Sequence, residues 1–395
     1  MAIYLDHAAT TPLRREVLEA MLPVLAETFG NPSSAHDFGR RARAALDEAR
    51  ESVAHDLRAD PREIVFTGGG SEAINLAIKG VAWAGRTRGH HLVTSAVEHE
   101  AVLHSARYLE KFGFEVTVLP VDRYGRVDPD ELAAAISDRT ILVSLQAVNN
   151  EVGTIQPIDE LVRRARAQRH VLVHLDAVQA APWMDLDVAA LDVDLLSIAG
   201  HKLEGPKGIG ALYVRRGTTL LAQQHGGPQE RHRRAGTENV AGAVGLAAAL
   251  RLARQERGTV PGRVRALRDR LRDAVLAVPG VELTGHPRDR IPGNLSVVVR
   301  DVDGQSLTLA LDLAGIACSS GSACATGSTE PSHVLSAMGY PAEEARGALR
   351  LTLGRTTTEG EIEAACAVVP ATIRRLREGA AALAADPLGL QAGSA

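Results

Sequence analysis

Lysine is scarce in this chain of 395 residues, which carries 44 lysine and arginine residues in all. Its only lysines are Lys79, Lys111, Lys202 and Lys207, and arginine supplies the remaining positive charge. A lysine ammonium can lose its proton and become a nucleophile or base, whereas an arginine guanidinium cannot. Lys202 and Lys207 lie close together in "SIAGHKLEGPKGIG". Although most lysines are solvated surface charges, this stretch is a candidate for chemistry that requires an amine.

Cysteine, long apolar runs and excess charge are also rare or absent. The 3 cysteines, Cys318, Cys324 and Cys366, are too few and too clustered for a disulfide framework, which fits a reducing cytoplasm. No run of about 18 apolar residues occurs, and "MAIYLDHAATTP" does not read as a signal peptide. We therefore expect a cytoplasmic protein with no membrane partner. A net charge of −4 gives no reason to expect direct nucleic-acid binding.

The length and the order of short apolar runs predict an α/β protein with two domains. Between residues 60 and 215, helix-period stretches alternate with runs that read as strands, namely "EIVFT", "HLVTS", "FEVTVLP", "TILVSLQ", "VLVHLDA", "DLLSIAG" and "GALYV". This alternation predicts a mostly parallel seven-stranded sheet flanked by helices. Such a sheet places its functional residues at the carboxyl ends of its strands. After residue 238, long helices followed by "GNLSVVVRD" and "LRLTLGR" indicate a smaller α+β domain.

Glycine-rich or ionisable residues follow four of these strands. The turn "TGGGSE" places Gly70 and Ser71 between a strand and a helix, where backbone N–H groups can bind a phosphate. The simpler reading of this turn is a helix start capped by Ser71. His99 and Asp176 end two further strands, and each has an ordinary alternative as a capping or turn residue. The fourth strand ends in "AGHK" with Lys202.

A phosphate site, an amine, a carboxylate and an imidazole at one sheet edge together indicate pyridoxal phosphate chemistry. A lysine binds that cofactor as a Schiff base, and a carboxylate pairs with the protonated ring nitrogen so that the ring accepts electrons. Each signal alone is weak, but the order and placement of the four are specific.

The chain resembles the cysteine desulfurases that serve iron–sulfur cluster assembly, which belong to class V of the fold-type I pyridoxal phosphate enzymes. The resemblance covers almost the whole chain and is carried by "YLDHAATTP", "GNPSSAH", "RADPREIVFTGGGSE", "EHEAVL", "VNNEVGTIQPI", "HLDAVQA", "AGHKLEGPKGIGALYVR", "HGGPQERHRRAGTEN", "SSGSACATGSTEPSHVLSAMG" and "LRLTLGRTTTEGEI". It implies a fold-type I architecture with a large cofactor-binding domain over residues 15–255. Residues 1–14 and 256–395 would form the small domain, with a mobile loop at about 318–331.

The resemblance also implies roles for individual residues. Lys202 would hold pyridoxal 5'-phosphate covalently and act as the base, His99 would stack on its ring, and Asp176 would pair with the ring nitrogen. Arg350 would bind the carboxylate of L-cysteine, and Cys324 would take its sulfur. The remaining positions would contact the cofactor or the substrate: Gly70, Ser71, Asn150, Gln179, His201 and, from the second subunit of a homodimer, Thr237.

The reaction so implied removes sulfur from L-cysteine and gives L-alanine and a persulfide on Cys324. The persulfide would pass to a scaffold protein for iron–sulfur clusters or to an enzyme of tRNA thiolation. Because the thiolate is the reactive form of cysteine, Cys324 needs a neighbouring cation or proton acceptor. No metal site is predicted, apart from a cluster held in transit at Cys324, since the spacing of Cys318, Cys324 and His333 fits no zinc pattern.

Two positions depart from the usual pattern of the family. Ala199 stands where a serine commonly donates a hydrogen bond to the phosphate, and the missing hydroxyl would weaken cofactor binding by roughly 1 kcal/mol. Cys318 is either a resolving thiol or an inert filler, and the second reading is preferred. Cys366 lies in an amphipathic helix and is expected in a core.

Two other functions remain open on sequence alone. A related class V enzyme, such as a selenocysteine lyase or an aminotransferase, would keep Lys202 but would not need Cys324. A noncatalytic scaffold or sulfur-relay protein would keep the fold without the chemistry. The presence of Lys202, Asp176 and His99 together argues against this last reading.

Overall fold

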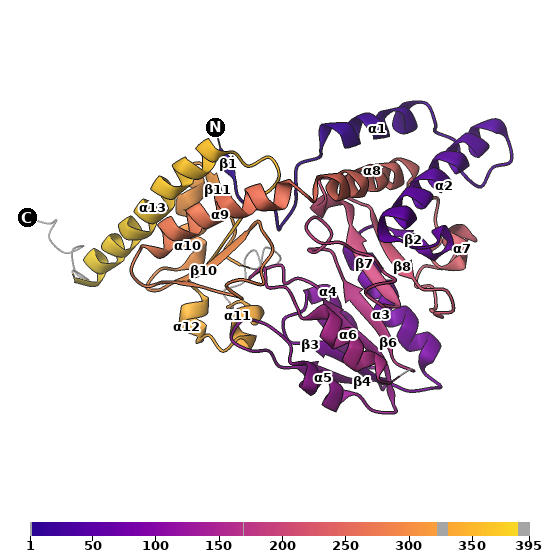
Figure 1. Cartoon of the computed structure of the whole chain (residues 1–395), viewed down its shortest axis with the longest axis horizontal. Coiled ribbons are helices and arrows are strands. Elements are labelled where there is room, and N and C mark those ends of the chain that lie inside the picture. The colour runs from indigo at the N-terminus through magenta and orange to yellow at the C-terminus, as the bar shows by residue number, and fades with distance from the viewer. Residues whose placement is uncertain (1, 169, 322–330, 386–395) are drawn as a thin grey trace, which may run out of the picture.

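The structure is a computed structural model that describes residues 2–168, 170–321 and 331–385. Its largest sheet has seven strands in the order β2-β8-β7-β6-β5-β3-β4 (Figure 1). These strands are β2 (Ile64–Thr67), β3 (His91–Ser95), β4 (Glu115–Leu119), β5 (Thr140–Gln146), β6 (Leu172–Asp176), β7 (Leu195–Ala199) and β8 (Gly210–Val214). Strand β8 is antiparallel to its neighbours β2 and β7, and the other six strands all run in the same direction. The predicted α/β class and the mostly parallel seven-stranded sheet are confirmed.

Helices cover both faces of this sheet, which explains why its central strands are apolar along their whole length. Every residue of β5 and β7 is buried, as expected for strands packed on both sides. One face packs on α2 (Asp37–Leu57), α5 (Pro129–Ala135), α6 (Ile158–Arg166) and α8 (Val240–Glu256). The other packs on α3 (Gly70–Gly85) and α4 (Glu100–Glu110).

A second body of structure surrounds a three-stranded antiparallel sheet in the order β12-β10-β9. Its strands are β9 (Val281–Leu283), β10 (Asn294–Val299) and β12 (Ala348–Thr352), and its helices include α9 (Val260–Leu276), α10 (Gly304–Leu313), α11 (His333–Ala337), α12 (Ala342–Ala345) and α13 (Glu359–Ala385). The N-terminal strand β1 (Ile3–Tyr4) pairs in parallel with β11 (Ile316–Ala317). Leu5 accordingly packs in the same apolar core as α9 and α13. The exact limits of the two predicted domains stay a prediction.

Several elements were not anticipated from the sequence. They include α1 (Arg15–Ala26), α2, and α7 (Gln229–His232), a distorted turn in which Glu230 and Arg231 have positive φ angles. Arg50 of α2 and Glu230 form a buried ion pair at 2.7 Å, and Glu230 also accepts a hydrogen bond from the backbone N–H of Phe66. These contacts anchor the segment that precedes Thr237 to strand β2.

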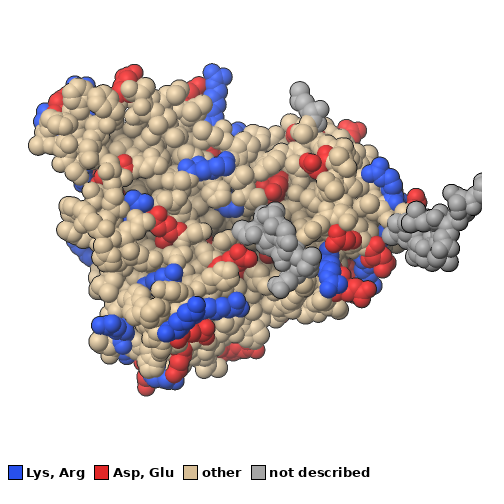
Figure 2. Space-filling view, turned by 180° about the vertical axis from the view of Figure 1, so that it is seen from behind, with Lys and Arg blue, Asp and Glu red and all other residues tan. Residues whose placement is uncertain are grey.

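Surface charge on the face shown in Figure 2 is mixed, with basic and acidic side chains interspersed instead of gathered by sign. Many charged side chains of the protein are paired along or between helices, as Arg43 is with Asp47 at 2.8 Å. Within the described ranges, no helix combines the length and apolarity needed to cross a membrane.

Candidate active site

A cavity of about 400 Å³ lies at the carboxyl ends of the parallel strands, where the sequence predicted the site. Its wall includes nine of the predicted site residues: Gly70, Ser71, His99, Asn150, Asp176, Gln179, His201, Lys202 and Arg350. These residues come from β12 as well as from the ends of β2, β3, β5, β6 and β7. Thr237 is exposed and does not line this cavity, while Cys324 falls outside the described residues. The roles assigned to these residues stay predictions.

Helix α3 presents its N-terminus to the cavity. Gly69 precedes the helix with φ 151°, and no side chain caps its first turn. A Cβ atom on Gly70 would lie 2.8 Å from Val178 Cγ2 and 3.3 Å from Ala199 Cβ, so this position has room only for glycine. The alternative reading, in which Ser71 caps the helix, is wrong, because Gly69 occupies the N-cap position and Ser71 lies within the first turn. The uncapped N–H groups and the positive end of the helix suit a phosphate.

His201 lies beside this helix end and is held by the N-terminal segment. Its Nδ1 is 3.1 Å from Thr10 Oγ1, and its backbone carbonyl accepts a hydrogen bond from Thr11 Oγ1 at 2.7 Å. Burial, together with the positive charges of Lys202 and Lys207, lowers the pKa of His201 to about 4. A neutral imidazole at this position can donate a hydrogen bond to a phosphate oxygen without itself being charged.

Lys202 ends the short helical turn that follows β7. Its Nζ donates hydrogen bonds to the backbone carbonyls of Ala8 and Ala9, the latter at 2.7 Å. Ala8 O also accepts a hydrogen bond from Gln179 Nε2 at 3.0 Å. The N-terminal segment therefore orients the amine, although 194 residues separate Ala8 from Lys202.

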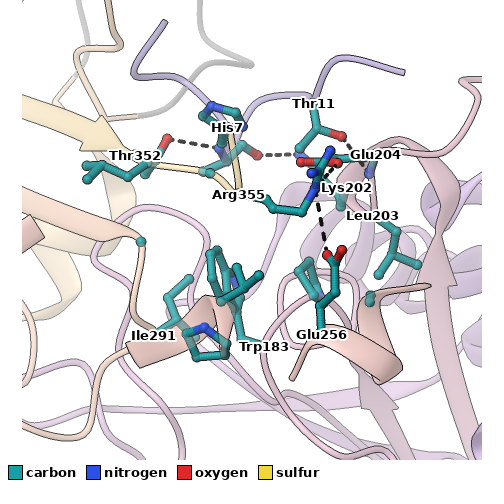
Figure 3. Close-up of a pocket in the computed structure, with 18 of the residues that line it drawn as sticks. His7, Thr11, Trp183, Lys202, Leu203, Glu204, Glu256, Ile291, Thr352 and Arg355 are labelled. Carbon is teal, nitrogen blue, oxygen red and sulfur yellow. Dashed lines mark hydrogen bonds and ion pairs between the residues drawn. The ribbon is translucent and has the colours of Figure 1, made fainter. Parts of the chain in front are cut away.

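A second cavity of about 70 Å³ is also lined by Lys202 (Figure 3) and shares Ala8 and Gln179 with the first. Trp183, Leu203 and Ile291 give it an apolar wall. Its rim carries two ion pairs at 2.8 Å, Arg355 with Glu204 and Arg14 with Glu256. The first of these joins the chain after β12 to the turn that carries Lys202. Lys202 thus lines both cavities and is only partly buried.

Asp176 and His99 combine a local structural role with a place at the cavity. Asp176, the last residue of β6, accepts a hydrogen bond from the N–H of Val178 at 3.0 Å, and burial raises its pKa. His99 caps α4, since its Nδ1 accepts from the N–H of Ala101 at 3.0 Å. The alternative roles, a turn residue for Asp176 and a helix cap for His99, are therefore confirmed. Both residues also line the cavity. The cap places the proton of a neutral His99 on Nε2.

Arg350 reaches the cavity from β12 and is only 1% exposed. Its two terminal nitrogens donate to Asn150 O and to Asp6 Oδ1, both at 3.0 Å. Its Nε is buried and has no hydrogen-bond partner among the described residues. A guanidinium has five N–H groups. The two contacts therefore fix its orientation and leave further donors for a carboxylate.

Sequence reasoning missed several residues of the cavity wall. They include Gln146, Glu151 and His333. His333 was considered only as a metal ligand, whereas its Nε2 lies 3.0 Å from the backbone carbonyl of Glu98. Within the described part of the chain, no group of three or more His, Cys, Asp or Glu residues is placed to hold a metal ion. The sequence feature that could have identified His333 as a residue of the cavity is its motif, "EPSHVL", which follows the glycine- and serine-rich segment.

The two described cysteines lie outside the cavity wall. Cys318 packs against the core of the smaller sheet, and burial raises the pKa of its thiol to about 12. Cys366 lies at the edge of the same core, so its predicted core position is confirmed only in part. Its pKa is also raised by burial. Burial therefore disfavours the thiolate form of both side chains.

Comparison with known proteins places the chain in a family. The model of the aminotransferase class-V family matches residues 3–365. Proteins named cysteine desulfurase IscS from Methanosarcina thermophila and Dictyoglomus turgidum are each 50% identical over 376 residues, covering 95% of this chain and 93% and 95% of theirs. The solved structure of a NifS-like protein superposes with a TM-score of 0.90 at 36% identity, covering 95% of this chain and 100% of that one. A structure described as SspA in complex with cysteine has a TM-score of 0.79 at 35% identity, covering 90% and 100%.

The chain therefore belongs to the aminotransferase class-V family. Within that family it belongs to the cysteine desulfurases, since its curated relatives carry that name at 50% identity over most of both chains. The family resemblance read from the motifs is confirmed.

Proposed function

We propose that this chain uses pyridoxal 5'-phosphate to remove sulfur from L-cysteine and carries that sulfur as a persulfide on Cys324. The observation that supports this most is the convergence of Lys202, Asp176 and the uncapped start of α3 on one cavity. The persulfide then passes to an iron–sulfur scaffold protein or to an enzyme of tRNA thiolation. We also propose a cytoplasmic location, as the sequence predicts.

The cavity suits the cofactor at each of its polar ends. The N–H groups at Gly70 and Ser71, with His201, would hold the phosphate, and Asp176 would pair with the ring nitrogen. Burial disfavours the charged form of Asp176, and a positive ring nitrogen would compensate for that cost. When bound, the cofactor supplies an electrophilic aldehyde and a ring that accepts electrons from the substrate. Gln179 would contact the ring hydroxyl, and His99 would lie against the ring.

Side chains of the protein would carry out substrate binding, proton removal and sulfur transfer. Arg350 and Asn150 bind the carboxylate of cysteine and orient its Cα–H bond toward Lys202. Lys202, once unprotonated, removes the Cα proton as general base. The thiolate of Cys324 then attacks the substrate sulfur, so that an S–S bond forms and the C–S bond breaks. The carbon skeleton, reprotonated, leaves as alanine.

We further propose that the site is completed in a homodimer, with Thr237 of one subunit reaching the phosphate held by the other. Thr237 is exposed and lies away from the cavity of its own chain. The preceding turn is anchored by the buried pair of Arg50 and Glu230. Thr237 is therefore accessible to a second subunit, while the turn before it is fixed to α2.

Mass spectrometry after incubation with L-cysteine tests the proposed function directly. The peptide that contains Cys324 is expected to gain one sulfur atom, and alanine is expected to accumulate with it. Cys318 shares that peptide with Cys324, because only "SSGSA" separates the two cysteines. Fragment ions within the peptide assign the added sulfur to Cys324 or Cys318, and the peptide of Cys366 is the internal control that should gain none. Alanine formation without any sulfur on Cys324 would exclude the persulfide route.

Replacing Arg350 with alanine is expected to raise KM for cysteine by about 10²-fold or more, with a smaller effect on kcat. The reason is the loss of charge-assisted hydrogen bonds to the substrate carboxylate, each worth about 1.5–3 kcal/mol. Arg350→Lys keeps the positive charge but cannot donate two parallel hydrogen bonds. Its KM should therefore lie between those of the wild type and Arg350→Ala. The exposed Arg346 on the same segment is the control, and Arg346→Ala should leave KM unchanged. An unchanged KM in Arg350→Ala would remove Arg350 from the substrate site.

A further inference from the structure

Glu98, which sequence reasoning did not single out, is a buried carboxyl group next to the cavity. It lies in the segment between β3 and α4, directly before His99, and is 1% exposed. Ser95 Oγ donates a hydrogen bond to its Oε1 at 2.6 Å. Its Oε2 is buried and has no hydrogen-bond partner among the described residues. A carboxylate in this state would be costly, because a buried charge needs a partner.

The surroundings of Glu98 favour the protonated form. Burial raises its pKa to about 8, and the negative charge of Asp176 adds to the increase. The hydroxyl of Ser95 and the backbone amide of Gln146 act in the opposite direction but do not cancel the effect of burial. The net effect favours the protonated carboxyl group of Glu98 at neutral pH.

Glu98 and Asp176 are linked through one strand. Gln146 of β5 pairs in register with Asp176 of β6, and its side-chain amide donates to the backbone carbonyl of Val97 at 2.6 Å. From the other side, His333 of α11 contacts the backbone carbonyl of Glu98 at 3.0 Å. The ionisable groups around the pair are therefore His99 from α4, His333 from α11 and, on the side of Asp176, Lys202.

We propose that Glu98 is a positioning residue that carries the proton of a buried carboxyl pair and so leaves the single negative charge on Asp176. This inference rests on the proposed function, because the charge on Asp176 matters there for the ring nitrogen of the cofactor. Because the charge of Asp176 raises the pKa of Glu98, the two buried carboxyl groups do not both ionise easily. Protonated Glu98 stays neutral, whereas ionised Glu98 would draw a proton onto Asp176 and weaken its pairing with the ring nitrogen.

The first test needs no cofactor and uses infrared spectroscopy of the full-length chain over a range of pH. A band from a protonated carboxyl group is expected at neutral pH and should disappear with a midpoint near pH 8. The band should be absent from Glu98→Gln and present in Asp176→Asn. If it is lost in Asp176→Asn, or retained in Glu98→Gln, the proton does not reside on Glu98 and the proposal fails. If Glu98→Gln does not fold, comparing the band of Asp176→Asn with that of the wild type still shows whether the proton resides on Asp176.

Stability measured against pH is the second test. The folded chain keeps the proton of Glu98 at pH values where the unfolded chain has released it, so the wild type loses stability as the pH rises toward 8. Relative to Glu98→Gln, its unfolding constant should increase by up to about tenfold per pH unit in that window. Glu110→Gln, at the exposed end of α4, is the matched control and should behave as the wild type does. Parallel curves for wild type and Glu98→Gln would contradict the proposal.

The third readout connects Glu98 with the cofactor. In the loaded enzyme, the visible absorption of the wild type should change between pH 7 and 9.5, whereas that of Glu98→Gln should change less over the same range. If the two spectra respond alike while the infrared result holds, Glu98 carries the proton but does not control the charge on Asp176. A chain that binds no cofactor at all would instead contradict the proposed function, and the first two tests would still apply to Glu98.

Discussion

Lys202→Ala is expected to abolish sulfide release from cysteine, with a fall in rate of about 10³-fold or more. Lys202 is the only lysine among the described residues that line the cavity, and its Nζ is oriented by two backbone carbonyls. No neighbouring amine in this part of the chain can replace it as covalent anchor or as base. The visible absorption of the bound cofactor should disappear together with the activity. Reductive trapping by borohydride should label the wild type at position 202 and leave the variant unlabelled.

Lys207 provides the matched control for this experiment. It lies five residues further along the same turn and is exposed. Lys207→Ala removes an equal charge from the same neighbourhood, so it should retain the absorption, the borohydride labelling and most of the activity. If Lys202→Ala kept its absorption band and could still be trapped by borohydride, the proposed cofactor chemistry at this lysine would be wrong.

Cys324→Ala is expected to reduce sulfide release by at least about 10³-fold while cofactor absorption stays intact. Cys324 lies outside the described residues, so the structural support for this prediction comes from the other two cysteines. Burial and the nearby carboxylates of Asp6 and Asp312 raise the pKa of Cys318 to about 12. Burial also raises the pKa of Cys366. Burial thus disfavours the thiolate form of both side chains, which is consistent with the proposed role of Cys324 as the acceptor of sulfur.

Cys318→Ala and Cys366→Ala are the controls, and both should retain activity within a few fold. This outcome would favour the reading of Cys318 as an inert filler over a resolving thiol. Intact turnover of selenocysteine or another amino acid by Cys324→Ala would support a related class V activity and contradict desulfuration through a persulfide.

The elements of the large sheet were predictable because its strands are short apolar runs that carry their own signal. "TILVSLQ" and "VLVHLDA" correspond to β5 and β6, with ends within a residue or two. Parallel strands bring their carboxyl ends to one edge. The convergence of His99, Asp176 and Lys202 therefore followed from their positions after strands. The direction of β8 was not predictable in this way, since its apolar pattern is the same in either orientation.

The contacts that tune the site depend on long-range packing. Arg350 pairs with Asp6, which lies 344 residues away in the sequence. Lys202 is oriented by Ala8 and Ala9. Neither contact leaves a periodic or local signal in the chain. The capping interpretation of Ser71 was wrong for a related reason, because the start of α3 is set by Gly69 and by the close approach of Val178 to Gly70.

The sequence by itself determined the family, the strands of the large sheet, and nine residues of the cavity wall, because these depend on residue type and on spacing along the chain. Only the tertiary structure decided which ionisable groups lose contact with water. Glu98 reads as an ordinary acidic residue before a helix, yet packing removes it from solvent and raises the pKa of its carboxyl group. Desolvation is a property of the whole surrounding fold, so no local pattern of residues encodes it.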